Sequence, residues 1–371
     1  MKFSIDRTAL LRALNQVQSV VESRNTIPIL RNVLMNANDG QLQLTTTDMD
    51  LEIKVAVPAN INEGGTTTVP ANTLHDIIKK MPEGSEVAME LDSNASAMEV
   101  KSGRSKFRLS CLPKDEFPEL GGSDLPVNFS LAAADLRTLI KRTSFAISTE
   151  ETRYYLNGIY VHAAETNGVP VLRSVATDGH RLAQYEMPLP EGAAQMSGII
   201  IPRKAVNEIK KLVDDAADQV EITLSESKIR FSVDHIILTS KLIDGTFPDY
   251  QRVIPANNDK VIEVDPRIFS SAIDRVSTIS DDKTRAVKIM LNGKTMTLSA
   301  NSPDAGSATE DLEVNSEVDD IEIGFNAKYL MDITGLVKEG CVIRLADSAS
   351  PTIITDAGDN SSLFVLMPLR V

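Results

Sequence analysis

The pattern of hydrophobic and polar positions switches repeatedly between a helical period and a strand period. Apolar residues three and four positions apart predict amphipathic helices beginning near residues 6, 134 and 265. Each helix precedes short stretches with apolar or β-branched residues at every second position, which predict strands. Examples are QLQLTTTD from Gln41, VPVLRSVATD from Val169 and TMTLSAN from Thr295. This pattern predicts an α+β protein with antiparallel sheets.

Several motifs recur about 130 residues apart, which indicates an internal repeat. TTTDMDL (45–51) recurs as VATDGHRL (175–182) with Leu51 matched to Leu182, DEFPEL (115–120) recurs as GTFPDY (245–250), and Pro70 recurs as Pro202. A third copy is more diverged but keeps the order of elements, with second helices predicted at 72–81, 203–213 and 326–338. Segments 112–128 and 244–260 are rich in Pro, Gly and Asp and are predicted to be exposed linkers. We therefore predict three like domains, 1–126, 127–257 and 258–371, each with two helices packed on antiparallel sheets.

Composition narrows the class of protein. A hydrophobic fraction of 42% and a charged fraction of 24% are typical of a globular chain. No apolar stretch has the length of a signal peptide or a membrane span, so we expect a cytoplasmic protein with no membrane contact. Cys111 and Cys341 are far apart and form no CxxC motif, so we expect reduced thiols, no metal and no cofactor.

The charge is distributed unevenly. The net charge of −14 argues against a protein that binds nucleic acid over its whole surface. The six predicted helices nevertheless hold 15 Lys and Arg against 7 Asp and Glu, whereas the remainder holds 23 against 45. Basic helical faces can hold a long polyanion while an acidic exterior repels it elsewhere. Alternatively, Lys and Arg are present only because they form helices well on solvated faces.

Asp178, His180 and Arg181 stand together in one turn and are the candidates for catalysis. A catalytic histidine needs a nucleophile or metal ligands nearby, and the other histidines, His75, His162 and His235, are isolated in the sequence. Asp followed by Gly is what a tight turn requires. A structural turn is therefore favoured over a hydrolase site.

Segments along the whole chain resemble the bacterial sliding clamp, the beta subunit of DNA polymerase III. They include MKFSIDR, IPILRNVL, VPANTLHDIIKKMPEG, SGRSKFRLSCLP, RYYLNGIYVH, VATDGHRLA, IPRKAVNEI, TSKLIDGTFPDYQRV, IGFNAKYLMDI and VLMPLRV. The resemblance implies three tandem DNA-clamp domains in a head-to-tail homodimeric ring with pseudo-sixfold symmetry, helices around the hole and no catalytic activity. It also implies binding to duplex DNA without sequence preference and to a clamp-loader complex, replicative and translesion DNA polymerases, mismatch-repair proteins and ligase. An acidic protein-interaction scaffold that never contacts DNA is the alternative.

The resemblance also implies three sets of site residues. An apolar cleft for client peptides comprises Leu156, Thr177, Gly179, His180, Arg181, Leu182, Pro248, Arg252, Val253, Asn326, Tyr329, Val365, Leu366, Met367, Pro368, Leu369 and Arg370. The residues facing DNA are Arg24, Lys79, Lys80, Tyr154, Tyr155, Arg203 and Lys204. The subunit interface pairs Phe107 and Leu109 with Thr278 and Ile279, with Arg104 and Lys106 facing Asp304, Glu310 and Asp311. On the residues alone, the tail is a closing core strand, and Phe107 and Leu109 are equally well core positions. Acidic Glu150 and Glu151 depart from the family pattern near the DNA-facing tyrosines.

Overall fold

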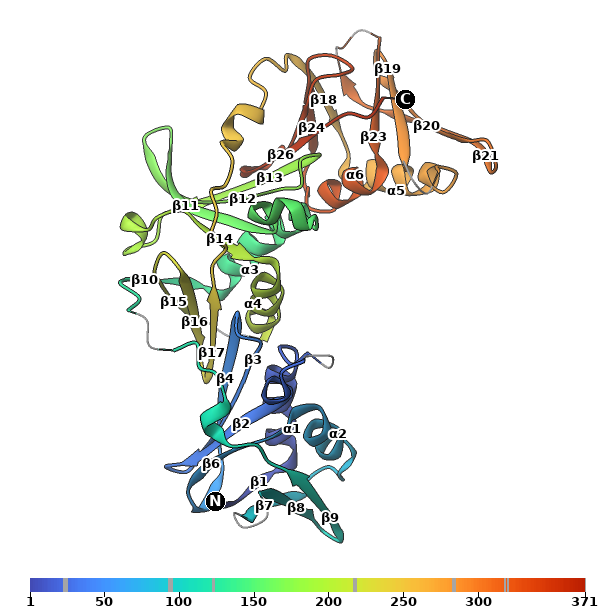
Figure 1. Ribbon diagram of the computed structural model, residues 1–371. Coiled ribbons are helices and arrows are strands. Elements are labelled where there is room, and N and C mark those ends of the chain that lie inside the picture. Colours follow the sequence, from blue (N-terminus) through green and yellow to red (C-terminus); the bar gives the residue numbers. More distant parts are fainter. Residues whose placement is uncertain are drawn as a thin grey trace. The chain divides into compact units, whose positions relative to one another are not determined.

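The computed structural model describes residues 1–22, 26–92, 96–121, 124–215, 219–281, 285–316, 318 and 320–370. The chain forms two compact units, which Figure 1 shows in the colours of the sequence. The first unit comprises Met1–Leu136 and Lys204–Leu242, and the second comprises Arg137–Arg203 and Ile243–Val371. The second repeat of the sequence therefore contributes to both units.

The predicted helices form, and their ends follow from local sequence. The α-helices of the described residues are α1 (Arg7–Gln18), α2 (Ala71–Lys80), α3 (Ala133–Thr143), α4 (Arg203–Asp215), α5 (Pro266–Ser277) and α6 (Ala327–Thr334). Asp6 caps α1 by accepting the Ala9 N–H at 2.9 Å, and Asp265 caps α5 in the same way. Helix α6 is shorter than the predicted 326–338, because Gly335 is its C-cap and the next residues form tighter turns.

The first unit contains two antiparallel sheets. Its five-stranded sheet has the order β5 (Asn60–Glu63), β1 (Lys2–Asp6), β7 (Glu86–Asp92), β8 (Ala97–Ser102) and β9 (Ser105–Ser110). Its eight-stranded sheet has the order β10 (Val127–Ala132), β15 (Gln219–Leu224), β16 (Lys228–Val233), β17 (Ile236–Lys241), β4 (Leu51–Pro58), β3 (Gln41–Thr47), β2 (Asn32–Asn38) and β6 (Gly65–Pro70). The larger sheet thus combines strands of the first and second repeats.

The second unit is built in the same way from the second and third repeats. Its nine-stranded sheet has the order β14 (Ile199–Pro202), β11 (Gly158–Thr166), β12 (Val169–Thr177), β13 (Arg181–Pro188), β26 (Asp359–Leu366), β25 (Thr352–Asp356), β24 (Cys341–Leu345), β18 (Lys260–Val264) and β22 (Asn315–Ser316). Its four-stranded sheet has the order β21 (Gly306–Glu313), β20 (Thr295–Ser302), β19 (Ala286–Asn292) and β23 (Ile321–Asn326).

Neighbouring repeats join through one kind of strand pair. The last strand of the second repeat, β17, pairs with β4 of the first, with Ser240 opposite Leu51. The last strand of the third repeat, β26, pairs with β13 of the second, with Leu366 opposite Arg181. Strand β9 of the first repeat corresponds to β17 and β26, and strand β21 of the third repeat corresponds to β4 and β13. In the described chain, β9 and β21 each lie at an end of their sheet.

The cores lie between helices and sheets within each unit. Helix α1 packs against α2 and against strands β3 and β4, and α5 packs against α6. The linkers are not simply exposed, as the sequence suggested, because Phe117 and Phe247 are both buried and anchor them. No helix of the described residues is long and apolar enough to cross a membrane.

Candidate client groove and DNA-facing residues

The turn before β13 is held by its own side chains. The Thr177 hydroxyl donates to the Arg181 carbonyl at 2.7 Å, and Asp178 Oδ1 accepts the N–H groups of His180 and Arg181 at 2.9 and 3.0 Å. Gly179 has a left-handed backbone with a φ of 88°, which glycine adopts without strain. This bonding accounts for Asp178 as a turn residue.

The first repeat builds the same turn, which corrects the sequence alignment. Asp48 Oδ1 accepts the N–H groups of Asp50 and Leu51 at 2.9 and 2.7 Å, and Met49 has a φ of 79°. His180 therefore corresponds to Asp50, and Arg181 corresponds to Leu51. The match of Leu51 with Leu182 was wrong by one residue, because it aligned apolar side chains rather than backbone positions.

Arg181 connects three parts of the second unit, its own turn, Phe145 and helix α6, although only 7% of its surface is exposed. Its guanidinium donates to Asp178 Oδ2 at 3.1 Å, to Asp332 Oδ2 at 2.6 Å and to the Phe145 carbonyl at 2.6 Å. It also lies 4.1 Å from the centre of the Tyr329 ring, within cation–π range. Arg181 thus packs against Tyr329 from inside the unit and is not itself an exposed contact residue.

A groove of about 760 Å³ lies beside this turn. The His180 and Tyr329 rings lie roughly parallel with centres 6.4 Å apart, and both line it. The chain's tail forms one wall, because the Met367 N–H donates to the His180 carbonyl at 2.9 Å and the Leu369 N–H to the Gly324 carbonyl at 2.8 Å. Beyond the tail is a second hollow of about 370 Å³, lined by Pro368, Leu369 and Arg370 among others.

Apart from Thr177, Gly179 and Arg181 of the turn and Pro368 of the second hollow, the predicted cleft residues fall into three groups. His180, Asn326, Tyr329, Leu369 and Arg370 line the groove together. Leu156, Leu182, Val365 and Leu366 are buried in the core. Pro248, Arg252, Val253 and Met367 are exposed, and Val253 and Met367 are large apolar side chains open to solvent, as an apolar peptide requires.

Sequence reasoning missed the far side of the groove. Lys288, Ser299, Asn301, Ser307 and Thr309 come from β19, β20 and β21 and line it as well. Alternation along these strands places the five residues on one sheet face. It does not show that this face is hollow, so no signal in the sequence identified them.

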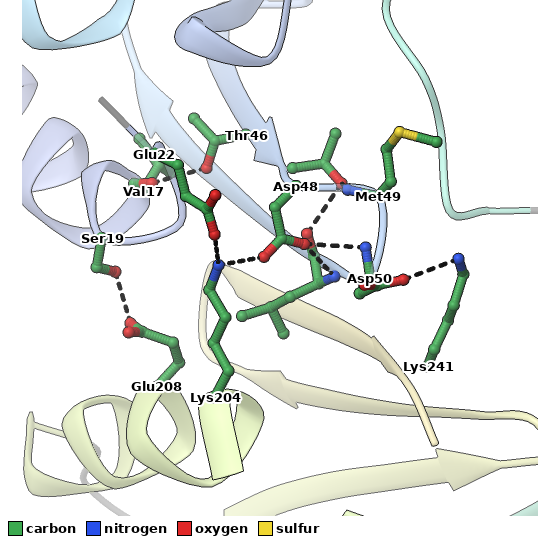
Figure 2. A network of polar contacts seen from close by, with 12 residues as sticks. Val17, Ser19, Glu22, Thr46, Asp48, Met49, Asp50, Lys204, Glu208 and Lys241 are labelled. Carbon is green, nitrogen blue, oxygen red and sulfur yellow. Dashed lines mark hydrogen bonds and ion pairs between the residues drawn. The ribbon is translucent and has the colours of Figure 1, made fainter. Parts of the chain in front are cut away.

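Of the residues predicted to face DNA, Lys204 is already occupied by carboxylates. Figure 2 shows its ammonium between Glu22, at 2.7 Å, and Asp48. Burial alone would lower the pKa of Lys204, but hydrogen bonds to Asp48 and Glu22 raise it overall. Nearby, the Ser19 hydroxyl donates to Glu208 at 2.5 Å. Lys204 therefore links α4 to the first repeat. A DNA phosphate would have to compete with two carboxylates for its ammonium group.

The other DNA-facing candidates differ in exposure. Lys79 and Lys80 are exposed at the end of α2, and Arg203 is exposed at the start of α4. Tyr154 is exposed, whereas Tyr155 is half-buried against the core. Arg24 lies outside the described residues. Glu150 forms an ion pair with Arg153 at 2.6 Å, which offsets part of the acidity of its loop.

The predicted interface residues lie on or near the two sheet ends. Phe107 on β9 is exposed, whereas Leu109 is buried. Thr278 is the exposed C-cap of α5, and Ile279 follows it half-buried. Glu310 on β21 forms an ion pair with Arg275 at 2.5 Å.

Comparisons with known proteins agree over the whole chain. The N-terminal, central and C-terminal domains of the DNA polymerase III beta subunit match residues 1–121, 130–249 and 251–370. Curated beta sliding clamps from Caulobacter vibrioides and Escherichia coli are 46% and 39% identical to the chain, each covered completely by it. The crystal structure of a DnaN sliding clamp from Bartonella birtlesii bound to griselimycin is 49% identical, with a TM-score of 0.97 and complete coverage of both chains.

The fold and these relatives define the class as a DNA sliding clamp with three tandem clamp domains. More particularly, the chain belongs to the DNA polymerase III beta subunit family, the beta sliding clamps. This membership decides for a clamp and against the acidic scaffold that never contacts DNA. No group of three or more His, Cys, Asp or Glu suited to a metal occurs in the described part of the chain.

Proposed function

We propose that two copies of the chain close head to tail into a ring around duplex DNA, through pairing of β9 of one copy with β21 of the other. The observation that carries this proposal is the strand pair that joins neighbouring repeats twice within the chain. Strands β9 and β21 are the remaining members of the same series. A third junction of the same kind closes two chains into a ring of six domains.

The internal junction predicts the register of the subunit interface. The β16–β17 turn pairs Val233 with Ile236, and the β8–β9 turn pairs Ser102 with Ser105, so Phe107 corresponds to Leu238. The Thr47–Glu52 pair corresponds to the Asn301–Ser307 pair, so Ala308 corresponds to Ile53. Because Leu238 lies opposite Ile53, Phe107 should lie opposite Ala308 of the other copy.

Burial and charge support this pairing. Phe107 is 37% exposed, whereas its equivalent Leu238 is fully buried by β4. A long exposed edge with apolar side chains is a template for another strand. Strand β9 carries Lys106 and Arg108, and β21 carries Glu310, Asp311 and Glu313, so the two edges are also complementary in charge.

An engineered disulfide tests the ring and its register together. Phe107→Cys with Ala308→Cys should oxidise to a covalent dimer near twice 40.4 kDa on a non-reducing gel. Phe107→Cys with Thr309→Cys is the matched control, because a shift of one residue turns the side chain to the other sheet face. Equal cross-linking of both pairs, or none in either, would contradict the proposed register.

We also propose that the groove beside His180 binds short client peptides with leucine and phenylalanine anchors. Polymerases, mismatch-repair proteins, ligase and the clamp loader are the clients, and griselimycin is a candidate competitor because a relative is bound to it. The turn that holds His180 has a structural rather than a catalytic role in this proposal, since Asp178 and Arg181 are engaged in structural bonds. As a replication factor the chain works in the cytoplasm, where it contacts no membrane.

Sequence-independent DNA binding follows from the ring. A clamp held by topology needs only weak phosphate contacts, and strong ones would slow sliding. Lys79, Lys80 and Arg203 are exposed and suited to such contacts. Lys204, held by two carboxylates, is a poorer candidate.

A further inference from the structure

A row of polar side chains crosses three strands of the second unit and meets the linker that follows β17. His162, Arg173 and Glu186 lie opposite one another on β11, β12 and β13. Arg173 donates to Glu186 at 2.6 Å and to the Tyr250 hydroxyl at 3.0 Å. His162 Nε2 lies 3.0 Å from the same hydroxyl. We call these four residues the linker clasp.

The contacts fix where the protons lie in the linker clasp. His162 Nδ1 is 2.9 Å from the Ala163 carbonyl, which can only accept, so Nδ1 carries the hydrogen. Nε2 of the neutral ring then accepts from the Tyr250 hydroxyl, whose oxygen accepts from Arg173. Neutral His162 completes the linker clasp, because a protonated ring would deprive the Tyr250 hydroxyl hydrogen of its Nε2 acceptor and place a second positive charge near Arg173.

The environment of His162 favours the neutral ring. Burial lowers the pKa of His162, and Arg173 lowers it further, while the bond to Ala163 and the charge of Glu186 act in the opposite direction. Tyr160 stacks on its other side with ring centres 4.7 Å apart. Because the folded pKa is below the ordinary value of about 6.5, the linker clasp is intact at neutral pH and loses stability as pH falls below that value.

The first repeat provides an internal comparison. At the same register its row is Asn36, Gln43 and Ala56, and Leu120 stands where Tyr250 does. No ring hydroxyl or guanidinium is present in that row. The corresponding space is a polar groove of about 490 Å³, lined by Asn36, Gln43 and Phe117 among others. The charged and aromatic row thus belongs to the repeat that carries the client groove.

The linker clasp holds the segment that carries two of the predicted cleft residues, Pro248 and Val253. Phe247 and Tyr250 are buried on either side of exposed Pro248, and Tyr250 begins the 3₁₀ turn Tyr250–Val253. Phe247 stacks on Tyr160 with ring centres 4.8 Å apart and planes 6° apart. Both buried rings belong to the core cluster that contains Leu156, Leu182 and Val365.

We infer that Tyr250, held by Arg173 and His162, is a positioning residue that sets Pro248 and Val253 for the apolar anchors of client peptides. This inference rests on the proposed client groove. Residues Tyr250–Val253 form a 3₁₀ turn rather than a strand, and the two buried rings and the hydroxyl contacts hold the linker here. Removing the hydroxyl leaves the ring packed but frees the turn to shift.

The test measures the affinity of the full-length chain for a fluorescent short peptide with two leucine anchors and one phenylalanine anchor. Tyr250→Phe should weaken binding by about tenfold. Tyr160→Phe is the matched control, since its hydroxyl points at Gly198 and lies outside the linker clasp. It should change affinity by less than about twofold. Thermal melting of both variants shows whether they remain folded.

A second readout measures the unaltered chain and needs a variant only to assign one signal. Binding that favours neutral His162 must lower the titration midpoint of His162, because linkage is reciprocal. Histidine-labelled NMR, with the signal assigned by its loss in His162→Gln, should show a decrease of about half to one pH unit with saturating peptide. If Tyr250→Phe binds the peptide normally and the His162 midpoint does not move, the inference is overturned but the proposed client groove is not. Failure of the parent chain to bind the peptide would overturn the client groove and the inference with it.

Discussion

Replacing Arg181 by leucine is the sharpest test of how the second unit supports the groove. Leucine is compatible with the backbone, because Leu51 occupies the same position of the same turn in the first repeat. The substitution leaves the carboxylates of Asp178 and Asp332 and the Phe145 carbonyl without their guanidinium partner. It also removes the cation that lies over Tyr329, a groove wall.

The magnitude follows from burial. Removing one partner of a fully buried ion pair costs about 3–5 kcal/mol. Because Asp332 is nearly one-third exposed, solvent reduces this to about 2–3 kcal/mol. At about 2–4 °C per kcal/mol, the melting temperature of the second unit should fall by roughly 4–12 °C. Peptide affinity should fall as well, since Tyr329 loses its support.

Calorimetry on the full-length chain measures the effect. Arg252→Leu is the control, because Arg252 is 84% exposed and its ion pair with Asp249 should contribute less than about 1 kcal/mol. In an Asp332→Ala background the cost of Arg181→Leu should shrink, which shows direct coupling. A melting temperature within about 1 °C of the parent, or an unchanged cost in that background, would refute the reasoning.

Two further predictions concern DNA and acid. Lys79→Ala with Lys80→Ala should weaken binding to open duplex and reduce the salt slope by about 0.9 per lost phosphate contact, whereas Lys204→Met should leave the slope unchanged. Asp356 accepts N–H groups from Lys338, Glu339, Gly340 and Gly358. Burial raises its pKa, but these bonds lower it overall, so its contribution to stability is present above about pH 4 and is lost as pH falls through the lowered value. Acid unfolding of Asp356→Asn should therefore be less steep than that of the parent.

Local patterns predicted most of the fold. Apolar spacing located the helices, alternation located the strands, and the motifs around Asp48 and Asp178 revealed repeats with equivalent turns. The end of α6 was missed because Gly335 stops the helix while the apolar residues continue to Val337. The sequence could not predict that neighbouring repeats contribute strands to one sheet, since strand alternation does not identify the neighbouring strand.

The features of the site that the sequence could not show are hydrogen bonds and ion pairs between residues far apart in the chain. Asp332, which accepts a hydrogen bond from Arg181, lies 151 residues later, so the sequence favoured a structural turn but could not show what Arg181 supports. The ion pairs of Lys204 could not be predicted either, because Glu22 and Asp48 are remote from it in sequence. Tyr250 looked like part of an exposed linker, because its partners His162 and Arg173 lie on strands far earlier in the chain.

Retention on circular DNA tests the central claim, encirclement of duplex by a ring, most directly. The chain is loaded by a clamp loader onto a singly nicked circular plasmid, and gel filtration then separates bound from free protein. The ring account predicts that the protein stays with the circle and is lost when the plasmid is linearised, because the contacts are topological and weak. Equal dissociation from the circular and linear forms would contradict it.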